Sequence, residues 1–351
     1  MRLSSLLFCL CVVSFPVMAA GQGLQRSGPM RFLYDMGVSD TDTSDPTMRQ
    51  QLLQLREAGI NVLSLDGWDA AAFQKLLPTL KADPLFSRFK YVLKIHPHVS
   101  SNWAANPTQV CSDAANGVLP ADTAQLLDGV AAFGKQNADY VVGYYTFDEP
   151  SNKGVNNGTT ICWQYQQLVY QRLRSGDPDS TDRPVITANT LYPVAPEDIK
   201  NSVSPNAQDI VFVDQYSTDP AVQATEYKDW GNMLKKVVPV FPAFSNNITT
   251  CQDPMLRTQF RPAVQSGLNT AYGANQPAVA GIAYFAFYPG RTYAYDAQNC
   301  APIFNSVVDD LQHDPIPVMT KIEPSLNLIL SCPASSSTAP ASSSTSSEPC
   351  Q

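Results

Sequence analysis

Eight short apolar runs, separated by helix-like segments, constrain the fold of this chain more than any other feature. The runs begin near residues 30, 60, 90, 140, 183, 209, 237 and 280, and each is rich in β-branched and aromatic residues. Strands that are apolar on both faces are typical of buried parallel sheets. The alternation therefore predicts a protein of the α/β class, a single (β/α)8 or TIM barrel. The alternative, a doubly wound open sheet, commonly has a glycine-rich phosphate turn after its first strand, and residues 34–42 contain none.

The segments between the runs carry helix signals. Residues 45–59 have an Asp at the start, a Pro in the first turn and a Gly at the end, which is the usual order of helix start and stop residues. Comparable patterns predict helices over residues 121–136, 160–176, 223–236, 256–273 and 301–312.

The two ends of the chain differ from the barrel region in composition. One Arg, an apolar run and small residues in the first twenty positions predict a signal peptide over residues 1–22; a membrane anchor is the alternative, but the run is short for one. Residues 333–351 are rich in Ser, Thr and Pro and predict a disordered tail. We therefore expect a secreted, extracellular monomer with one catalytic-type domain over residues 23–332 and no membrane association.

Cysteines and charge agree with export. An even number of cysteines after the signal peptide favours disulfides, and six cysteines allow fifteen connectivities. Their positions beside neighbouring strand-to-helix loops favour the pairs Cys111–Cys162 and Cys251–Cys300, which leaves Cys332 with Cys350. A zinc site is the alternative, but no CxxC motif occurs.

Two further features concern the surface. Sequons at Asn157 and Asn247 predict a glycoprotein in a host that glycosylates. A formal net charge of -8 does not favour binding to the negatively charged backbone of nucleic acid, so no nucleic-acid partner is expected.

Polar and aromatic residues gather where the predicted strands end. In a barrel of this kind the active site lies at the C-terminal ends of the strands. Carboxylates and amides bind sugar hydroxyls, and Trp and Tyr rings stack on the C–H faces of sugars. The pattern therefore predicts a carbohydrate substrate with no cofactor and no metal. The expected substrate ligands are Asp35, Asp66, Trp68, His96, His98, Trp103, Asn189, Gln215, Tyr216, Tyr284 and Tyr288.

Two adjacent carboxylates, Asp148 and Glu149, end the fourth apolar run. Cleavage of a glycosidic bond needs a proton donor and a second carboxylate about 5 to 9 Å away. Burial beside Asp148 would keep Glu149 protonated near neutral pH, which makes Glu149 the candidate general acid. If Glu149 points into the barrel, strict alternation places Tyr145 and Phe147 on the same side. The alternative is that both acids only cap the next helix or bind loop amides.

The pentapeptide TFDEP, residues 146–150, resembles the Asn-Glu-Pro that ends strand 4 in the large clan of retaining (β/α)8 glycoside hydrolases containing cellulases, mannanases and β-galactosidases. The resemblance implies that Glu149 is the acid/base residue and that Asp148 stands where the clan has an Asn that contacts the sugar 2-hydroxyl. The clan's nucleophilic Glu lies on strand 7, and residues 237–247 contain no acid. The two-Glu mechanism of the clan therefore does not carry over.

Asp214, at the end of the sixth run, is the leading candidate for the second carboxylate. The sixth strand lies two strands from the fourth, so the gap between Asp214 and Glu149 could admit a water, as inversion of configuration requires. A substrate-assisted route is also open. Families that hydrolyse N-acetylhexosaminides pair an Asp with the acid Glu at strand 4 and use a strand 6 Tyr, and Asp148, Glu149 and Tyr216 are similar.

Two other interpretations, a metal-dependent hydrolase and a binding protein, compete with a metal-free glycoside hydrolase. Lys94, His96 and His98 alternate along the third run, and a His-x-His pair on a strand can bind a metal. The missing acid on strand 7 also fits a secreted carbohydrate-binding barrel that is not catalytic.

Overall fold

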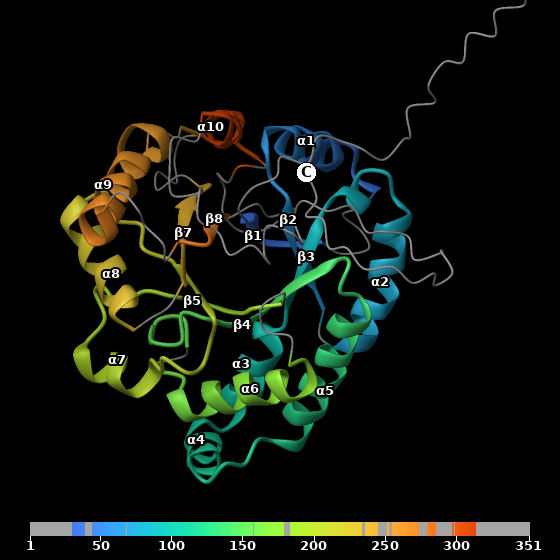
Figure 1. Cartoon of the computed structure of the whole chain (residues 1–351), viewed down its shortest axis with the longest axis vertical. Coiled ribbons are helices and arrows are strands. Elements are labelled where there is room, and N and C mark those ends of the chain that lie inside the picture. Colours follow the sequence, from blue (N-terminus) through green and yellow to red (C-terminus); the bar gives the residue numbers. More distant parts are fainter. Residues whose placement is uncertain are drawn as a thin grey trace, which may run out of the picture.

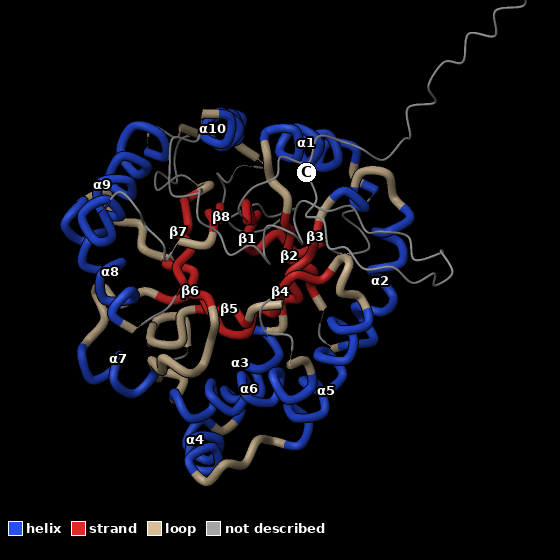
Figure 2. The backbone as a smooth tube through the Cα atoms, viewed as in Figure 1, coloured by secondary structure: helices blue, strands red, loops and turns tan. Residues whose placement is uncertain are grey.

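Eight parallel strands close into one barrel in their sequence order. The computed structural model describes residues 30–38 (34–38 as backbone), 44–67, 69–156, 158–178, 183–233, 236–244, 251–252, 255–273, 279–285, 297 and 299–313. Figure 1 looks along the barrel, and Figure 2 shows the strands at the centre with helices around them. The strands are β1 Met30–Val38, β2 Val62–Asp66, β3 Lys90–Lys94, β4 Val141–Asp148, β5 Val185–Asn189, β6 Ile210–Val213, β7 Lys236–Pro242 and β8 Gly281–Phe285. The predicted TIM barrel is confirmed; the predicted signal peptide and tail lie outside the described residues.

The helices lie outside the barrel and cover its strands (Figure 2). They are α1 Pro46–Ala58, α2 Ala70–Ala82, α3 His96–Ala105, α4 Pro107–Ala115, α5 Ala121–Gln136, α6 Trp163–Gly176, α7 Pro196–Ser202, α8 Pro220–Asn232, α9 Arg261–Tyr272 and α10 Ala301–Gln312, with a 3-10 turn at Phe86–Arg88 and a π-helical turn at Leu256–Phe260. The start of α1 follows the prediction: the Asp45 carboxylate accepts hydrogen bonds from the backbone N–H groups of Thr47 and Met48. Gly59 ends the helix with a φ of 126°.

Apolar side chains form two layers, one inside the barrel and one between strands and helices. Inside the barrel, the Phe32 and Phe212 rings lie 5.3 Å apart, and Tyr145 stacks on Phe212 at 6.3 Å. Such packing makes the interior a core rather than a channel, as is usual for eight-stranded barrels. Access to the barrel is therefore limited to its rim.

A register shift in β4 changes which side chains face the interior. The pairing of β4 with β5 slips between Tyr145 and Phe147. Tyr145 belongs to the interior layer, whereas Phe147 packs outward on Tyr165 of α6, with ring centroids 5.9 Å apart. The expectation that Tyr145 and Phe147 share a face is wrong, because an irregular extra residue breaks strict alternation.

Strand β3 is shorter than the sequence indicated. It ends at Lys94, and α3 begins at His96 with Pro97 in its first turn. His96 and His98 therefore do not alternate along a strand, and that part of the prediction is wrong. Among the residues that the structure describes, no cluster of three or more His, Cys, Asp or Glu could hold a metal ion.

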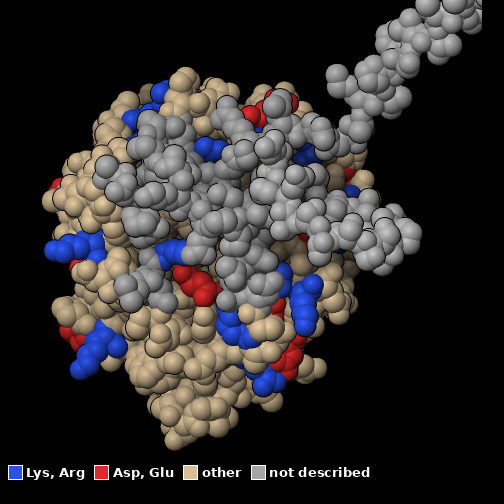
Figure 3. Space-filling view, in the orientation of Figure 1, with Lys and Arg blue, Asp and Glu red and all other residues tan. Residues whose placement is uncertain are grey.

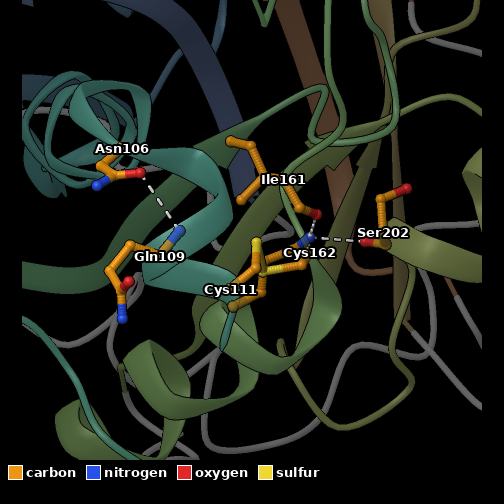
Figure 4. The surroundings of a disulfide bond; sticks show 7 residues. Asn106, Gln109, Cys111, Ile161, Cys162 and Ser202 are labelled. Carbon is orange, nitrogen blue, oxygen red and sulfur yellow. Dashed lines mark hydrogen bonds between the residues drawn. A yellow bond between two sulfur atoms is a disulfide. The ribbon is translucent and has the colours of Figure 1, made fainter. Parts of the chain in front are cut away.

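Two of the three predicted disulfides are confirmed. Cys111 of α4 is bonded to Cys162 at the start of α6 (Figure 4). Cys251 is bonded to Cys300 at the start of α10. The first bond links the loop regions after β3 and β4. Cys332, Cys350 and both sequon asparagines lie outside the described residues. No helix in the described part of the chain is long and apolar enough to cross a bilayer.

Candidate active site

Three carboxylates lie at the C-terminal mouth of the barrel: Asp148 ends β4, Glu149 directly follows β4, and Asp214 directly follows β6. Asp148 pairs in register with Ala188 of β5, and Ala188 pairs with Phe212 of β6. Asp214 directly follows the last residue of β6, so it lies at about the level of Asp148 and Glu149. Neighbouring strands are about 4.8 Å apart, which places the two acid-bearing backbones roughly 10 Å apart. Side chains that point inward from both strands can approach more closely than that.

Asp148 faces the interior of the barrel. Because of the shift in β4, it follows Tyr145 on the inner side, and the Tyr145 hydroxyl donates a 2.9 Å hydrogen bond to Asp148 Oδ1. Tyr145 is fully buried, so this contact connects the carboxylate directly to the core. The role that the resemblance implies for Asp148, a contact with the sugar 2-hydroxyl, stays a prediction.

Glu149 has an unusual backbone conformation, with a φ of 40°. Positive φ costs a non-glycine residue about 1 kcal/mol, so surrounding contacts must hold it. Its N–H donates to Ala188 O at 2.9 Å, and its carbonyl accepts from Asn156 Nδ2 at 2.7 Å and from the Asn152 N–H at 2.9 Å. Asn152 Nδ2 also donates to Glu149 Oε2 at 2.8 Å. The acid is thus fixed by its backbone and by its side chain.

Burial and nearby negative charge raise the pKa values of Glu149 and Asp214. Burial, reinforced by the charge of Asp148, raises the pKa of Glu149 to about 7, and the hydrogen bond from Asn152 opposes part of this rise. Burial raises the pKa of Asp214 well above its ordinary value, and the charges of Glu149 and Asp148 add to the effect. Asp214 is 9% exposed, and its Oδ1 has no hydrogen-bond partner among the described residues.

The β2–β3 side of the mouth is polar. Asp66 Oδ1 lies 3.6 Å from Lys94 Nζ across the two strands. The His96 ring meets Tyr145 edge-on, with ring centroids 5.0 Å apart, and its Nδ1 is buried without a partner in the described part of the chain. Burial lowers the pKa of His96 to about 3, so the ring is neutral at physiological pH. His96 can therefore donate or accept a hydrogen bond there, but it carries no charge.

The β6–β8 side of the mouth is aromatic. Tyr216 is half-buried, and its ring lies 5.1 Å from Phe244 and 6.4 Å from Phe285. Phe244 and Phe285 also contact each other, at 5.9 Å, and both are half-buried. The site therefore has an acidic wall at β4, a polar wall at β2–β3 and an apolar wall at β6–β8. Phe244 and Phe285 were not predicted from the sequence, although each ends an apolar run.

Two predicted ligands, Asn189 and Gln215, are bonded within the protein instead. Asn189 Oδ1 accepts from the Thr190 N–H at 3.0 Å and lies 2.5 Å from Ser151 Oγ. Gln215 Nε2 donates to Tyr192 O at 2.6 Å. Both side chains are buried and have protein partners, so they lie beside the site rather than facing a ligand.

Two others are placed away from the mouth. Trp103 of α3 is 1% exposed within the outer layer, and Tyr284 is fully buried and donates to Asp310 Oδ2 at 2.5 Å. A ring with no accessible face cannot stack on a sugar, so the predicted role is wrong for these two residues. His98 is half-buried in α3. The side chain of Asp35, and Trp68 and Tyr288, lie outside the described residues.

The face of the molecule drawn in Figure 3 carries charges of both signs. In Figure 3 acidic and basic side chains are interspersed over the described part of this face.

No protein-family model matches the sequence, and no curated protein matches it. Solved structures with similar folds include a GH5-4 broad-specificity endoglucanase from an uncultured bovine rumen ciliate, at 11% identity and a TM-score of 0.49 over 83% of this chain and 97% of that one. A GH26 endo-β-1,4-mannanase from Bacillus sp. JAMB-750 matches at 11% identity and 0.47 over 85% and 91%. A GH99 endo-α-mannosidase from Bacteroides thetaiotaomicron matches at 12% and 0.46 over 76% and 84%. At these values the likeness concerns the barrel fold and assigns no activity. Fold and site together define a (β/α)8 barrel with a carboxylate cluster at its C-terminal mouth.

Proposed function

We propose that this protein is a secreted glycoside hydrolase in which Glu149 is the general acid. The observation that carries the proposal is the position of Glu149 at the mouth, with its pKa raised to about 7 beside two further carboxylates. A carboxyl group with such a pKa holds a proton at mildly acidic pH and can release it to a leaving group. The aromatic wall at Tyr216 and the polar wall at His96 suit the two kinds of surface of a sugar.

In the proposed reaction, Glu149 protonates the glycosidic oxygen as the bond to the anomeric carbon breaks. Asp214 is the proposed second carboxylate, which activates a water on the opposite face of the sugar. Glu149 and Asp214 repel each other when both are charged, so the protonation of one depends on that of the other. When Glu149 carries its proton, it has no negative charge to raise the pKa of Asp214. Asp214 therefore ionises more readily when Glu149 is ready to act as the acid.

A non-catalytic carbohydrate-binding barrel is the second candidate. It is favoured by the absence of any acid in residues 237–247, where the resembling hydrolases have their nucleophile. It is also favoured by the deep burial of Asp214. The two functions predict opposite outcomes when the charge of Glu149 is removed.

The test compares release of reducing ends from a panel of polysaccharides and chitin fragments by wild type and Glu149→Gln. Glu226→Gln is a matched control. Glu226 is a buried Glu of α8 whose pKa burial also raises to about 7, and it contacts Leu191 N and Trp230 Nε1 instead of the acid cluster. We expect activity in wild type and in the control, and a loss of at least about 100-fold in Glu149→Gln. If none of the three proteins releases reducing ends and all three still bind glycans, the non-catalytic carbohydrate-binding function is supported.

Export is part of the proposal and is tested separately. Mass analysis of protein secreted by a eukaryotic host should show an N-terminus near residue 23. Retention of residues 1–22 in the mature protein contradicts it.

A further inference from the structure

Strand β5 lies between the two strands that carry the proposed acid and its partner. β4 and β6 do not pair with each other, so whatever β5 carries at its end sets the spacing of Glu149 and Asp214. The backbone makes the first link: the Glu149 N–H donates to Ala188 O at 2.9 Å, and the Asp214 N–H donates to Asn189 O at 3.1 Å. Consecutive residues of β5 thus hold the two acids.

Side chains make a second link above the first. Ser151, two residues after Glu149, has its Oγ 2.5 Å from Asn189 Oδ1 and 3.1 Å from Thr190 O, so its proton is shared between two acceptors. Gln215, the residue after Asp214, donates from Nε2 to Thr190 Oγ1 at 3.1 Å. Both acid-bearing loops are therefore bonded to Thr190, from opposite sides.

Thr190 is itself held firmly. Its N–H donates to Asn189 Oδ1 at 3.0 Å, and its hydroxyl donates to Tyr192 O at 2.9 Å, the carbonyl that Gln215 also contacts. The exposed fractions of Ser151, Asn189, Thr190 and Gln215 are 1%, 2%, 7% and 8%. A buried and satisfied polar network of this kind rigidifies its surroundings.

We propose that Thr190 is a positioning residue that fixes the separation of Glu149 and Asp214 through its contacts with Ser151 and Gln215. The inference rests on the proposed hydrolase function. Its physical basis is that displacement of one reacting group by about 1 Å costs on the order of 100-fold in rate. The hydroxyl of Thr190 is the only atom that Gln215 Nε2 reaches on this residue among the described contacts.

The test uses a near-isosteric pair of variants. Thr190→Val removes the hydroxyl and keeps the shape, and Thr190→Ser keeps the hydroxyl. Thr123→Val is the matched control: Thr123 is a fully buried Thr of α5 whose hydroxyl accepts a 3.0 Å hydrogen bond from Asn102 Nδ2, away from the acids. We expect Thr190→Val to lower kcat by about 10- to 100-fold with KM within about threefold. Thr190→Ser should recover most of the lost rate, and the control should resemble wild type.

A second readout does not depend on activity. The pKa of Asp214, followed by 13C NMR of its carboxyl group, should fall in Thr190→Val and return to the wild-type value in Thr190→Ser. The reason is that loss of the contact between Thr190 and Gln215 lets Asp214 move away from Glu149, which weakens the repulsion between the two carboxylates. If wild type hydrolyses nothing, the proposed function fails, and the titration still decides the inference. An unchanged Asp214 pKa in Thr190→Val, or equal kcat losses in Thr190→Val and Thr123→Val, overturns it. If Thr190→Val does not fold, Ser151→Ala removes the hydrogen bond between Ser151 and Thr190 instead. That variant must then show the same fall in kcat and the same fall in the pKa of Asp214.

Discussion

Replacement of Glu149 by Gln should make the folded protein more stable at alkaline pH while it removes activity. The pKa of Glu149 in the folded protein, about 7, lies above its ordinary value of 4.5. The folded protein therefore binds this proton more tightly than the unfolded chain does, and its stability falls as pH rises through that window. Each pKa unit corresponds to about 1.4 kcal/mol, which gives about 3 kcal/mol, and solvent screening at this half-buried site reduces the figure to about 2 kcal/mol.

Gln is a suitable replacement because its side-chain oxygen can still accept the hydrogen bond from Asn152. Urea denaturation at pH 8 should show Glu149→Gln to be about 2 kcal/mol more stable than wild type, and at pH 5 the difference should fall below about 1 kcal/mol. The exposed Glu57 provides a control, since Glu57→Gln should stay within about 0.5 kcal/mol at both pH values. A stabilisation of Glu149→Gln that is absent at pH 8, or the same at pH 5, would refute the reasoning.

Three further predictions follow from the same contacts. The activity of wild type should decline as pH rises through about 7, because Glu149 must be protonated to act, and a pH–rate profile that rises above pH 8 is incompatible with this role. Asn152→Ala removes the hydrogen bond that lowers the pKa of Glu149, so the alkaline limb of the profile should move to higher pH; an unmoved limb shows that Asn152 does not tune the acid. Replacing both Cys111 and Cys162 by Ala opens a loop of 51 residues, and chain entropy predicts a loss of about 4 kcal/mol in the free energy of unfolding, measured with urea against the oxidised wild type. A loss below about 1 kcal/mol would show that the loop is already constrained without the bond.

The sequence was most informative about the order of the strands, because buried parallel strands have a simple signature. It was least informative where strand pairing departs from the ideal. Nothing in the letters of β4 marks the slip that turns Phe147 outward, since it arises from pairing with β5. The end of β3 was more accessible, because Pro97 suits the first turn of a helix and could have indicated that His96 starts one.

The candidate site was predicted unevenly for a related reason. Charge and position at a strand end were enough to select Glu149, Asp148 and Asp214. The roles of Asn and Gln side chains were harder to predict, because an amide at a strand end can face a ligand or hydrogen-bond to its neighbours with equal ease. Asn189 and Gln215 do the second, and only the distances to Ser151 and Thr190 reveal it.

The slip in β4 also affects how such a protein can evolve. Because the Tyr145 hydroxyl donates to Asp148 and the Tyr145 ring stacks on Phe212, the cluster at the mouth is in direct contact with the interior layer of the barrel. A change at Phe212 that preserves volume and stability can still move the Tyr145 ring and, with it, the acid. In most barrels loops vary freely over a conserved scaffold. Here selection on chemistry reaches into the scaffold, so tolerated substitutions in this part of the core should be fewer than packing alone demands.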